Sequence, residues 1–537
     1  MHEGKEVTGR RGALGTESAE AARVGARLLE EGGNAMDAAA AACLVNAITL
    51  PYFVDLGGYV CAATVLEGAS GRVWSLDANC VAPAGAREDM FDVTAREPGK
   101  IGINENEYDC SVNGDANIYG PLAVAPPGFV AGVGLLWEKW GRLKWEQIVA
   151  GALDVVDRGF PYGDTAAAID KRLPVIVKFE PTKQLLLPSG RPPRPDDVWH
   201  RTDLSATLRR LAAAGWRDFY DGEIGRRIGD YVNAIGGVMT RADMAAFEPR
   251  VTGTLETTYR GAVAHGPILP NGALSALQIL NMLECVDAYP LDDVRYWHQL
   301  AEILKLAWRD RLSYLADPAF ADVPAKRLLD KAYAAERTET IRKLPDHVDR
   351  EGAPLPSANP HGTAHVSAAD SDGNVVSVTI SQGNPFGSCV TVPGTGFILG
   401  HGMCRLDPRP GRPNSIAPGK RPLNNVCPLI IRMPDRDIAV GMRGGRRIVS
   451  VVSQIAHRLV DFGMSPRAVS TSMRIHTLAD EPIEYDASAP LPFEGELTRM
   501  GHRFRRVDEL GGSAHCAEIA RPSRIVRGGG AVAAAAV

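Results

Sequence analysis

Residues 361–379 read HGTAHVSAADSDGNVVSVT, and this stretch decides the fold that we expect for the chain. Apolar and polar residues alternate from Thr363 to Asp370 and again from Val375 to Ser381, with a Ser-Asp-Gly-Asn turn between them. The pattern predicts a β-hairpin. The preceding segment 345–362, PDHVDREGAPLPSANPHG, is polar and proline-rich without periodicity, which predicts a mobile linker. Thr363 is therefore expected at the start of a strand, immediately after a linker.

Helical periodicity dominates the chain before this linker, and strand patterns dominate it afterwards. Residues 18–31 and 34–46 predict two packed helices, and 52–77 predict strands around a glycine turn at 55–58. Further helices are predicted at 128–140, 145–157, 203–214, 222–235, 241–246, 273–286, 294–315 and 446–461, further strands at 388–399, 427–433 and 437–441, and irregular loops at 86–125 and 180–200. The last residues, GGGAVAAAAV, fit either a frayed tail or a final strand. This order indicates an α/β fold in which helices cover two sheets.

The composition argues against several classes of partner. Of the 537 residues, 45% are hydrophobic and 23% are charged, which is enough apolar material for a large core. The formal net charge is −5 and the Lys and Arg residues are dispersed, so we expect no nucleic-acid partner. The start has no apolar leader-like segment, and about 18 uninterrupted apolar residues occur nowhere, which favours a cytoplasmic protein with no membrane partner. The nine cysteines contain no C-x-x-C pair and are expected to be reduced thiols.

Thr363 is the first candidate for chemistry. A threonine freed at its own N-terminus carries a general base, because its α-amine can accept the proton of its hydroxyl. Cleavage between Gly362 and Thr363 would create such a residue without any histidine triad. The alternative is that Thr363 only favours the β-conformation at the start of a strand.

The second candidate is MRGGRR at 442–447, between a predicted strand and a predicted helix. Gly444 and Gly445 can point their amides at a developing oxyanion, and the helix dipole favours negative charge there. The alternative is an ordinary tight turn. His361 and His365 have no carboxylate or cysteine at metal-ligand spacing, so we expect no site metal, and no dinucleotide fingerprint suggests a cofactor.

Several segments taken together resemble one family, the γ-glutamyltranspeptidases, which are N-terminal nucleophile hydrolases. The similarity is carried, in chain order, by ESAEAARVGARLLEEGGNAMDAAAAACLVNAITLP (17–51), PPGFVAGVGLLWEKWGRLKWEQIVAGALDVVDRGFPY (126–162), residues 361–379, PGTGFILGHGM (393–403), PGKRPLNNVCPLII (418–431) and GMRGGRRI (441–448). The resemblance covers nearly the whole chain.

The resemblance implies a four-layer αββα N-terminal nucleophile hydrolase fold and self-cleavage before Thr363. A large subunit, 1–362, and a small subunit, 363–537, would then form one composite αββα domain as a heterodimer. Thr363 would carry an acyl-enzyme intermediate, with Ser381 assisting the nucleophile. Gly444 and Gly445 match the glycines of the family's oxyanion hole.

The residues that would bind a γ-glutamyl substrate depart from the family pattern. Asn79 stands where an R-E-x-A-P motif has the arginine that holds the α-carboxylate, and Asn424 and Asn425 replace paired serines. The Asn, Gln and Asp that hold the α-amine in the family fall on Gly383, Gly402 and Arg405. Losing charge-assisted contacts of this kind, about 1.5–3 kcal/mol each, should weaken γ-glutamyl binding severely.

Arg405 and Arg443 add positive charge near the expected pocket, which indicates an anionic acyl group without an α-ammonium. Two surface arginines without a substrate role are the alternative. The leading hypothesis is a self-processed hydrolase or acyltransferase that cleaves an amide or carbon-carbon bond of a small molecule other than glutathione, as in alkylproline antibiotic biosynthesis. A genuine γ-glutamyl transferase or glutathione hydrolase and an unprocessed binding protein are the alternatives.

Overall fold

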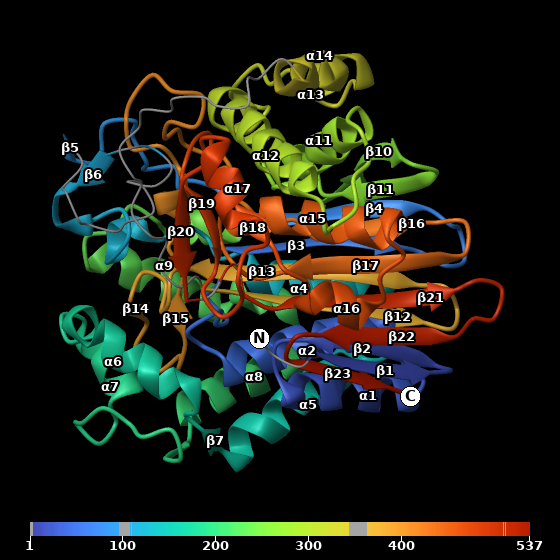
Figure 1. Cartoon of the computed structure of the whole chain (residues 1–537). Helices are drawn as coiled ribbons and strands as arrows, with labels where there is room; N and C mark the ends of the chain where they lie inside the picture. Colours follow the sequence, from blue (N-terminus) through green and yellow to red (C-terminus); the bar gives the residue numbers. More distant parts are fainter. Residues whose placement is uncertain (1–3, 96–107, 109, 343–361, 509, 511) are drawn as a thin grey trace.

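The computed structural model describes residues 4–95, 108, 110–342, 362–508, 510 and 512–537. Two seven-stranded antiparallel sheets lie at its centre (Figure 1). The first sheet has the order β23 (Ala533–Ala536), β2 (Gly12–Thr16), β12 (Gly362–Asp370), β13 (Val375–Gly383), β3 (Val60–Leu66), β4 (Val73–Asn79) and β9 (Arg250–Gly253). The second has the order β1 (Lys5–Gly9), β22 (Val526–Gly530), β21 (Ala514–Ala520), β17 (Arg436–Met442), β16 (Leu429–Arg432), β11 (Ala262–Gly266) and β10 (Leu255–Tyr259). Each sheet combines strands from both sides of the predicted cleavage position.

Helices cover the outer face of each sheet, which gives the αββα arrangement. On the first sheet lie α1 (Ala19–Glu30), α2 (Ala35–Thr49), α4 (Phe129–Trp140) and α5 (Trp145–Arg158), and on the second lie α11 (Ala273–Glu284), α12 (Val294–Tyr314) and α15 (Arg447–Asp461). Every residue of α2 from Ala35 to Ile48 is buried, because its alanines let the helix pack closely between β12 and its neighbouring helices. A reciprocal capping box between Asn34 and Asp37 begins this helix.

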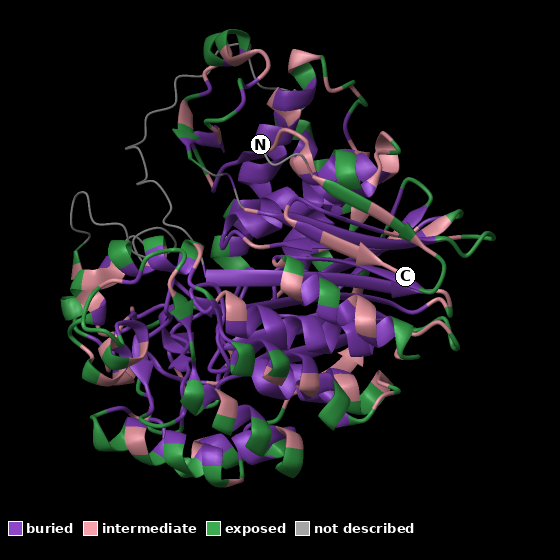
Figure 2. Ribbon diagram, turned by 90° about the horizontal axis from the view of Figure 1, so that it is seen from below, coloured by how far each residue is buried: buried purple, intermediate pink, exposed green. Residues whose placement is uncertain are grey.

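The two sheets are joined by polar contacts as well as by apolar packing. All nine residues of β12 are buried, and so are all nine of β13. Figure 2 shows the strands at the centre of the molecule coloured as buried. Two serines of β12 and β13 face the second sheet, where the Ser367 hydroxyl donates to the carbonyl of His515 at 3.1 Å and the Ser377 hydroxyl to that of Val440 at 2.9 Å. These buried hydroxyls are satisfied and fix how β12 lies over β17 and β21.

Smaller elements complete the described chain. They are α6 (Asp164–Ile176), α7 (Glu180–Leu186), α8 (Thr202–Ala214), α9 (Glu223–Ala234), α10 (Arg241–Ala245), α13 (Ala325–Leu328), α14 (Lys331–Arg342), α16 (Pro466–Thr471) and α17 (Glu494–Arg499), with the strands β5 (Val93–Ala95), β6 (Cys110–Val112), β7 (Phe160–Pro161), β8 (Val198–Trp199), β14 (Val390–Thr391), β15 (Ile398–Leu399), β18 (Ile475–His476), β19 (Ile483–Asp486) and β20 (Phe504–Val507). Four short 3₁₀ turns lie at Asn113–Asp115, Pro121–Ala123, Trp216–Phe219 and Gly402–Arg405. No helix in these described ranges has the length and apolar character needed to span a membrane.

Three sequence-based element predictions were wrong. Residues 52–54 form a turn and β3 begins only at Val60, because the Asp55 carboxylate accepts hydrogen bonds from Arg201 at 2.6 Å and from the Leu56 amide at 2.9 Å, which holds the turn. The predicted loop 180–200 begins with α7, and the single strand predicted at 388–399 is the short pair β14 and β15.

Of the two alternatives for the C-terminus, the strand is correct: the last residues form part of β22 and then β23 rather than a frayed tail. The predicted linker lies outside the described residues except for Gly362, which begins β12.

Candidate active site

Thr363 is the second residue of β12, where that strand pairs with the end of β13. Thr363 is opposite Ser381, and a register irregularity separates Gly362 from Thr363. The threonine is 2% exposed, and its Oγ1 lies 3.0 Å from Ser381 Oγ. The structure therefore brings together the candidate nucleophile and the hydroxyl that the resemblance assigned to it.

The Ser381 hydroxyl has three polar neighbours, and their roles can be assigned. Its Oγ lies 2.5 Å from the carbonyl oxygen of Gly362, which can only accept, and accepts from the Gly383 amide at 3.0 Å. Because a serine hydroxyl has one proton, which goes to Gly362, the Thr363 hydroxyl donates to Ser381. Ser381 thus links the candidate nucleophile to the carbonyl of the peptide bond that precedes it.

Gly362 is held against the backbone of the turn after β13. A Cβ added at Gly362 would lie 2.8 Å from the carbonyl oxygen of Asn384 and 2.9 Å from that of Gly383. Only glycine allows this close approach of two backbone segments. The Gly362–Thr363 peptide is consequently held in two ways. Gly362 packs closely against the backbone of the turn, and the Ser381 hydroxyl binds the Gly362 carbonyl.

Gly444 and Gly445 occupy the turn between β17 and α15, with φ of +142° and +57°. Their carbonyls accept from the Arg447 and Ile448 amides, which begin α15, while neither glycine amide donates to backbone within the described ranges. Gly441, near the end of β17, lies against the ring of His365, two residues after Thr363. The glycine pair and Thr363 therefore lie at the same edge of the two sheets, with the positive end of the α15 dipole on that side.

Arg443 is held in a contact that sequence reasoning missed. Its Nε lies 3.2 Å from Glu17 Oε2 and its guanidinium lies 4.5 Å from the centre of the Phe53 ring. Glu17 also lies 3.2 Å from Nε2 of His515 on β21. Arg443 and these three partners come from four separate parts of the sequence, and no local pattern around Glu17, Phe53 or His515 could have connected them.

Arg405 lies in the 3₁₀ turn 402–405 and is buried. Its carbonyl accepts from the Tyr108 hydroxyl at 2.9 Å and from the Asn414 amide at 2.8 Å, which fixes the turn. Burial, followed by the charge of Arg405, lowers the pKa of His401 to about 3. Arg405 is buried and Arg443 is only partly exposed, so neither is the surface side chain of the alternative interpretation. A substrate role for either stays a prediction.

Two positions that match the family's amine-binding residues have no room for a side chain. A Cβ at Gly383, where φ is +98°, would lie 1.7 Å from Nε2 of His401. A Cβ at Gly402 would lie 2.4 Å from Sγ of Cys80. The His401 ring is itself fixed, since its Nε2 accepts from the Asn384 amide at 2.8 Å and its Nδ1 lies 3.2 Å from the Ile118 carbonyl.

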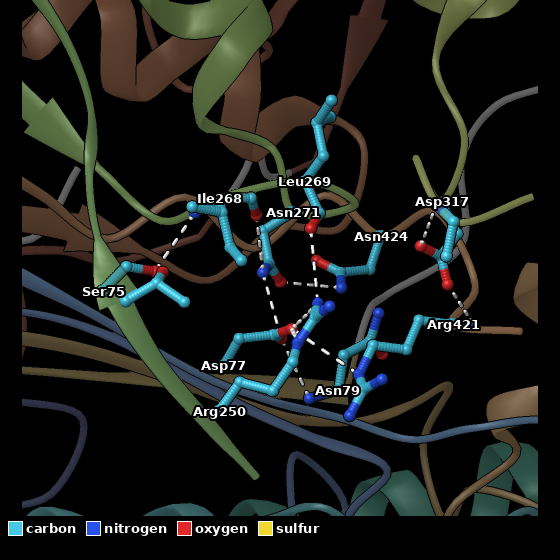
Figure 3. A network of polar contacts seen from close by, with 12 residues as sticks. Ser75, Asp77, Asn79, Arg250, Ile268, Leu269, Asn271, Asp317, Arg421 and Asn424 are labelled. Carbon is cyan, nitrogen blue, oxygen red and sulfur yellow. Dashed lines mark hydrogen bonds and ion pairs between the residues drawn. The ribbon is translucent and has the colours of Figure 1, made fainter. Parts of the chain in front are cut away.

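The asparagines predicted to line the pocket bind the protein itself. Asn79 donates to the Pro422 carbonyl at 2.7 Å, and Asn424 donates to Asn271 at 2.9 Å, which in turn donates to Asp77 (Figure 3). Both Asn79 and Asn424 are fully buried.

Asn425 accepts from Arg311 at 2.8 Å and is also buried. All three asparagines therefore have a structural reason to be present, and contact with substrate stays a prediction.

His365 also has partners within the protein, because its two ring nitrogens each lie 2.9 Å from a hydroxyl, those of Thr379 and Ser367. Burial lowers the pKa of His365 well below its usual value. His361 lies outside the described residues.

Comparisons with known proteins agree on one family. Residues 21–531 match the family model described as Gamma-glutamyltranspeptidase. The Acylase ACY 1 proenzyme of Pseudomonas sp. (strain SE83) is 32% identical over 520 residues, covering 95% of this chain and 90% of the relative. The Glutathione hydrolase proenzyme of Bacillus subtilis (strain 168) is 30% identical over 517 residues, covering 92% of this chain and 86% of the relative. The crystal structure of cephalosporin acylase from Bacillus halodurans superposes with a TM-score of 0.86 at 25% identity, covering 99% of this chain and 97% of that chain.

Proposed function

Since this chain belongs to the γ-glutamyltranspeptidase family of N-terminal nucleophile enzymes, we propose that it cleaves itself before Thr363 and then acts as an acylase on a small molecule other than glutathione. The observation that carries the proposal is the Thr363–Ser381–Gly362 arrangement, in which one hydroxyl contacts both the nucleophile and the preceding carbonyl. Two relatives named as proenzymes support the self-cleavage.

The self-cleavage follows from this geometry. Thr363 Oγ1 attacks the carbonyl carbon of Gly362, and the Ser381 hydroxyl donates to the oxygen on which negative charge develops. Collapse breaks the Gly362–Thr363 C–N bond and leaves an ester on Oγ1, with the proton passing to the new α-amine. Water then hydrolyses the ester, leaving a carboxylate on Gly362 and a free amine on Thr363.

The free amine allows Thr363 to act on a substrate. The α-amine accepts the proton of Oγ1 as the oxygen attacks the acyl carbon, and the Gly444 and Gly445 amides stabilise the oxyanion. The leaving amine takes that proton and departs, which leaves an acyl-enzyme. Water completes hydrolysis, or a second amine completes transfer.

The acyl group is proposed to carry a carboxylate but no α-ammonium. Positive charge is present at Arg405, whereas the positions for amine partners at Gly383 and Gly402 are closed by His401 and Cys80. The acylase relative supports an amide as the bond cleaved. Carbon-carbon bond hydrolysis in antibiotic biosynthesis would use the same acyl-enzyme and stays a prediction from the sequence. Glutathione hydrolysis is the second candidate, because the Bacillus subtilis relative bears that name.

The denatured mass of freshly purified protein tests the self-cleavage. Wild type is expected as two pieces, 1–362 and 363–537, with Thr363 at a new N-terminus, and Thr363→Ala is expected as one chain. A single wild-type chain would leave Thr363 without a free amine and would favour the binding-protein interpretation. Cleavage of Thr363→Ala at the same bond would exclude Thr363 as the attacking residue.

A matched pair of anilides tests the substrate class. Glutaryl-anilide and γ-glutamyl-anilide differ only in the α-ammonium, so kcat/KM is expected to be at least about tenfold higher for the glutaryl compound, corresponding to about 1.4 kcal/mol. Higher turnover of the γ-glutamyl compound would establish the second candidate instead.

A variant series tests the role of Arg405. Arg405→Met should raise KM for glutaryl-anilide and leave butanoyl-anilide, which has no carboxylate, unaffected, and Arg412→Ala, an exposed neighbour, should change neither. Equal loss on both substrates would indicate damage to the fold rather than loss of a carboxylate contact.

A further inference from the structure

A buried cluster of charged and imidazole groups lies outside the Thr363 site. Helix α12 contributes His298, Glu302 and Lys305, which share one face because they are spaced by four and three residues. Glu481, just before β19, and His502, just before β20, complete the cluster. Glu481 and His502 are at most 2% exposed, and Glu302 is 7% exposed.

The distances place three potential metal ligands together. His298 Nδ1 lies 2.9 Å from His502 Nε2, and one ligand atom from each of His298, Glu302 and His502 lies within 4.8 Å of the others. Two imidazoles bound to one tetrahedral Zn²⁺ have nitrogens about 3.3 Å apart, given Zn–N bonds of about 2.0–2.1 Å. The pair therefore needs to open by only about half an ångström to admit the ion.

Glu481 orients His502 for such a role. Its Oε1 lies 2.9 Å from His502 Nδ1, so the ring carries its proton on Nδ1 and points the lone pair of Nε2 into the cluster. A carboxylate behind a ligating histidine is the usual second partner in protein zinc sites, where it fixes the tautomer and strengthens the ligand.

The formal charge of the cluster also favours a cation. Lys305 Nζ contacts Glu302 Oε1 at 3.0 Å and also contacts Glu481, so one ammonium faces two carboxylates. With neutral imidazoles, these five side chains carry a net charge of −1. This negative charge attracts a cation, and His298, Glu302 and His502 offer nitrogen and oxygen ligands that suit zinc.

We propose that His298, Glu302 and His502 form a Zn²⁺ site that joins the two pieces of the cleaved chain. The ion replaces the proton shared between His298 Nδ1 and His502 Nε2, and His298 then carries its proton on Nε2. Because His298 and Glu302 precede residue 362 and His502 follows it, the ion crosslinks the large and small pieces without a peptide bond. Zinc binding itself does not require the reaction at Thr363, whereas the crosslink between two pieces rests on the proposed self-cleavage.

Calorimetric titration of chelator-treated full-length protein with zinc chloride tests the proposal. Wild type is expected to bind one Zn²⁺ per chain with micromolar or tighter affinity, and His298→Ala is expected to bind it about 100-fold more weakly or not at all. His298 is partly exposed, which makes its replacement the mildest change in the cluster. The matched control is His200→Ala, because His200 is exposed and follows β8, and its affinity should equal that of wild type.

Cobalt provides a second readout that needs no variant. Co²⁺ bound to wild type should give the intense visible absorption of a four-coordinate ion with nitrogen ligands, and Zn²⁺ should displace it. Absence of zinc binding by wild type would overturn the proposal, with Lys305 then serving as the only cation of the cluster. Equal affinities for His298→Ala and wild type would also overturn it, as would an octahedral cobalt spectrum.

Discussion

Replacing Gly383 by Asn would restore the residue type that the γ-glutamyltranspeptidase pattern has at this position, and the structure indicates that the protein cannot accept it alone. The new Cβ would lie 1.7 Å from His401 Nε2, and the backbone has a φ of +98°. A non-glycine residue at positive φ costs about 1–2 kcal/mol, and overpacking of a buried site costs about 1–3 kcal/mol.

Displacing the His401 ring adds a further cost. The ring accepts from the Asn384 amide, and that buried amide would lose its partner, at about 1–3 kcal/mol. Gly383→Asn is therefore expected to destabilise the protein by about 3–8 kcal/mol. His401→Ala alone should also destabilise it, because the fully buried ring leaves a cavity.

The two changes together should partly cancel. In Gly383→Asn/His401→Ala the asparagine occupies the space that the imidazole leaves, so adding His401→Ala should raise the melting temperature of Gly383→Asn although it lowers that of wild type. Differential scanning calorimetry of the four proteins measures this change of sign. If His401→Ala lowers the melting temperature equally in both backgrounds, the ring does not fill the position, and our explanation for the loss of the amine partner is wrong.

Three further outcomes are expected. Ser381→Ala should slow self-cleavage by about 10²–10³, because the Gly362 carbonyl loses its donor, whereas Ser381→Thr should cleave nearly as wild type in a time course of denatured mass. Burial lowers the pKa of His476 to about 3, so the unfolded state binds more protons than the folded state between pH 6.5 and 3. The free energy of unfolding therefore falls as the pH drops through this range, by about 1.4 kcal/mol per pH unit. Between pH 7 and 5 the melting temperature of His476→Gln should fall less than that of wild type. Asp77→Asn should destabilise by about 3 kcal/mol in thermal unfolding, because it leaves the Arg250 charge uncompensated, while the exposed Asp230→Asn should leave the melting temperature nearly unchanged.

The sequence predicted the elements whose signal is local. The hairpin of β12 and β13 alternates along its length, and α15 has a clear helical period, so both could be located from the sequence. Strand β2 could not, because GALGT has no alternation and every residue of it is buried between β12 and β23. Its conformation depends on strands more than 300 residues away in sequence, and β-propensity is weak against such context.

The candidate site divides in the same way. Thr363, Ser381 and the two glycines at 444 and 445 could be identified because each belongs to a continuous motif. The contact of Arg443 with Glu17 could not, since 426 positions separate the two residues. For Asn79, the motif suggests the pocket, and contact with substrate stays a prediction; its hydrogen bond to the Pro422 carbonyl depends on neighbours that the motif does not contain.

The elements that carry each group explain how binding can change while the nucleophile is kept. Thr363 and Ser381 lie on paired strands, and an altered register there would move every buried side chain of β12 to the opposite face of its sheet. The departures from the family pattern lie elsewhere, at strand ends and in the turns around 401–405 and 424–425. Turns tolerate replacement because fewer buried contacts depend on their register. At Gly383 and Gly402 the space that a side chain would need is filled by His401 and Cys80, so under the proposed function the wall of the pocket is repacked and not merely emptied. On that proposal an α-ammonium is rejected by shape as well as by the absence of partners, and single substitutions toward the family residues should therefore fail to restore γ-glutamyl turnover.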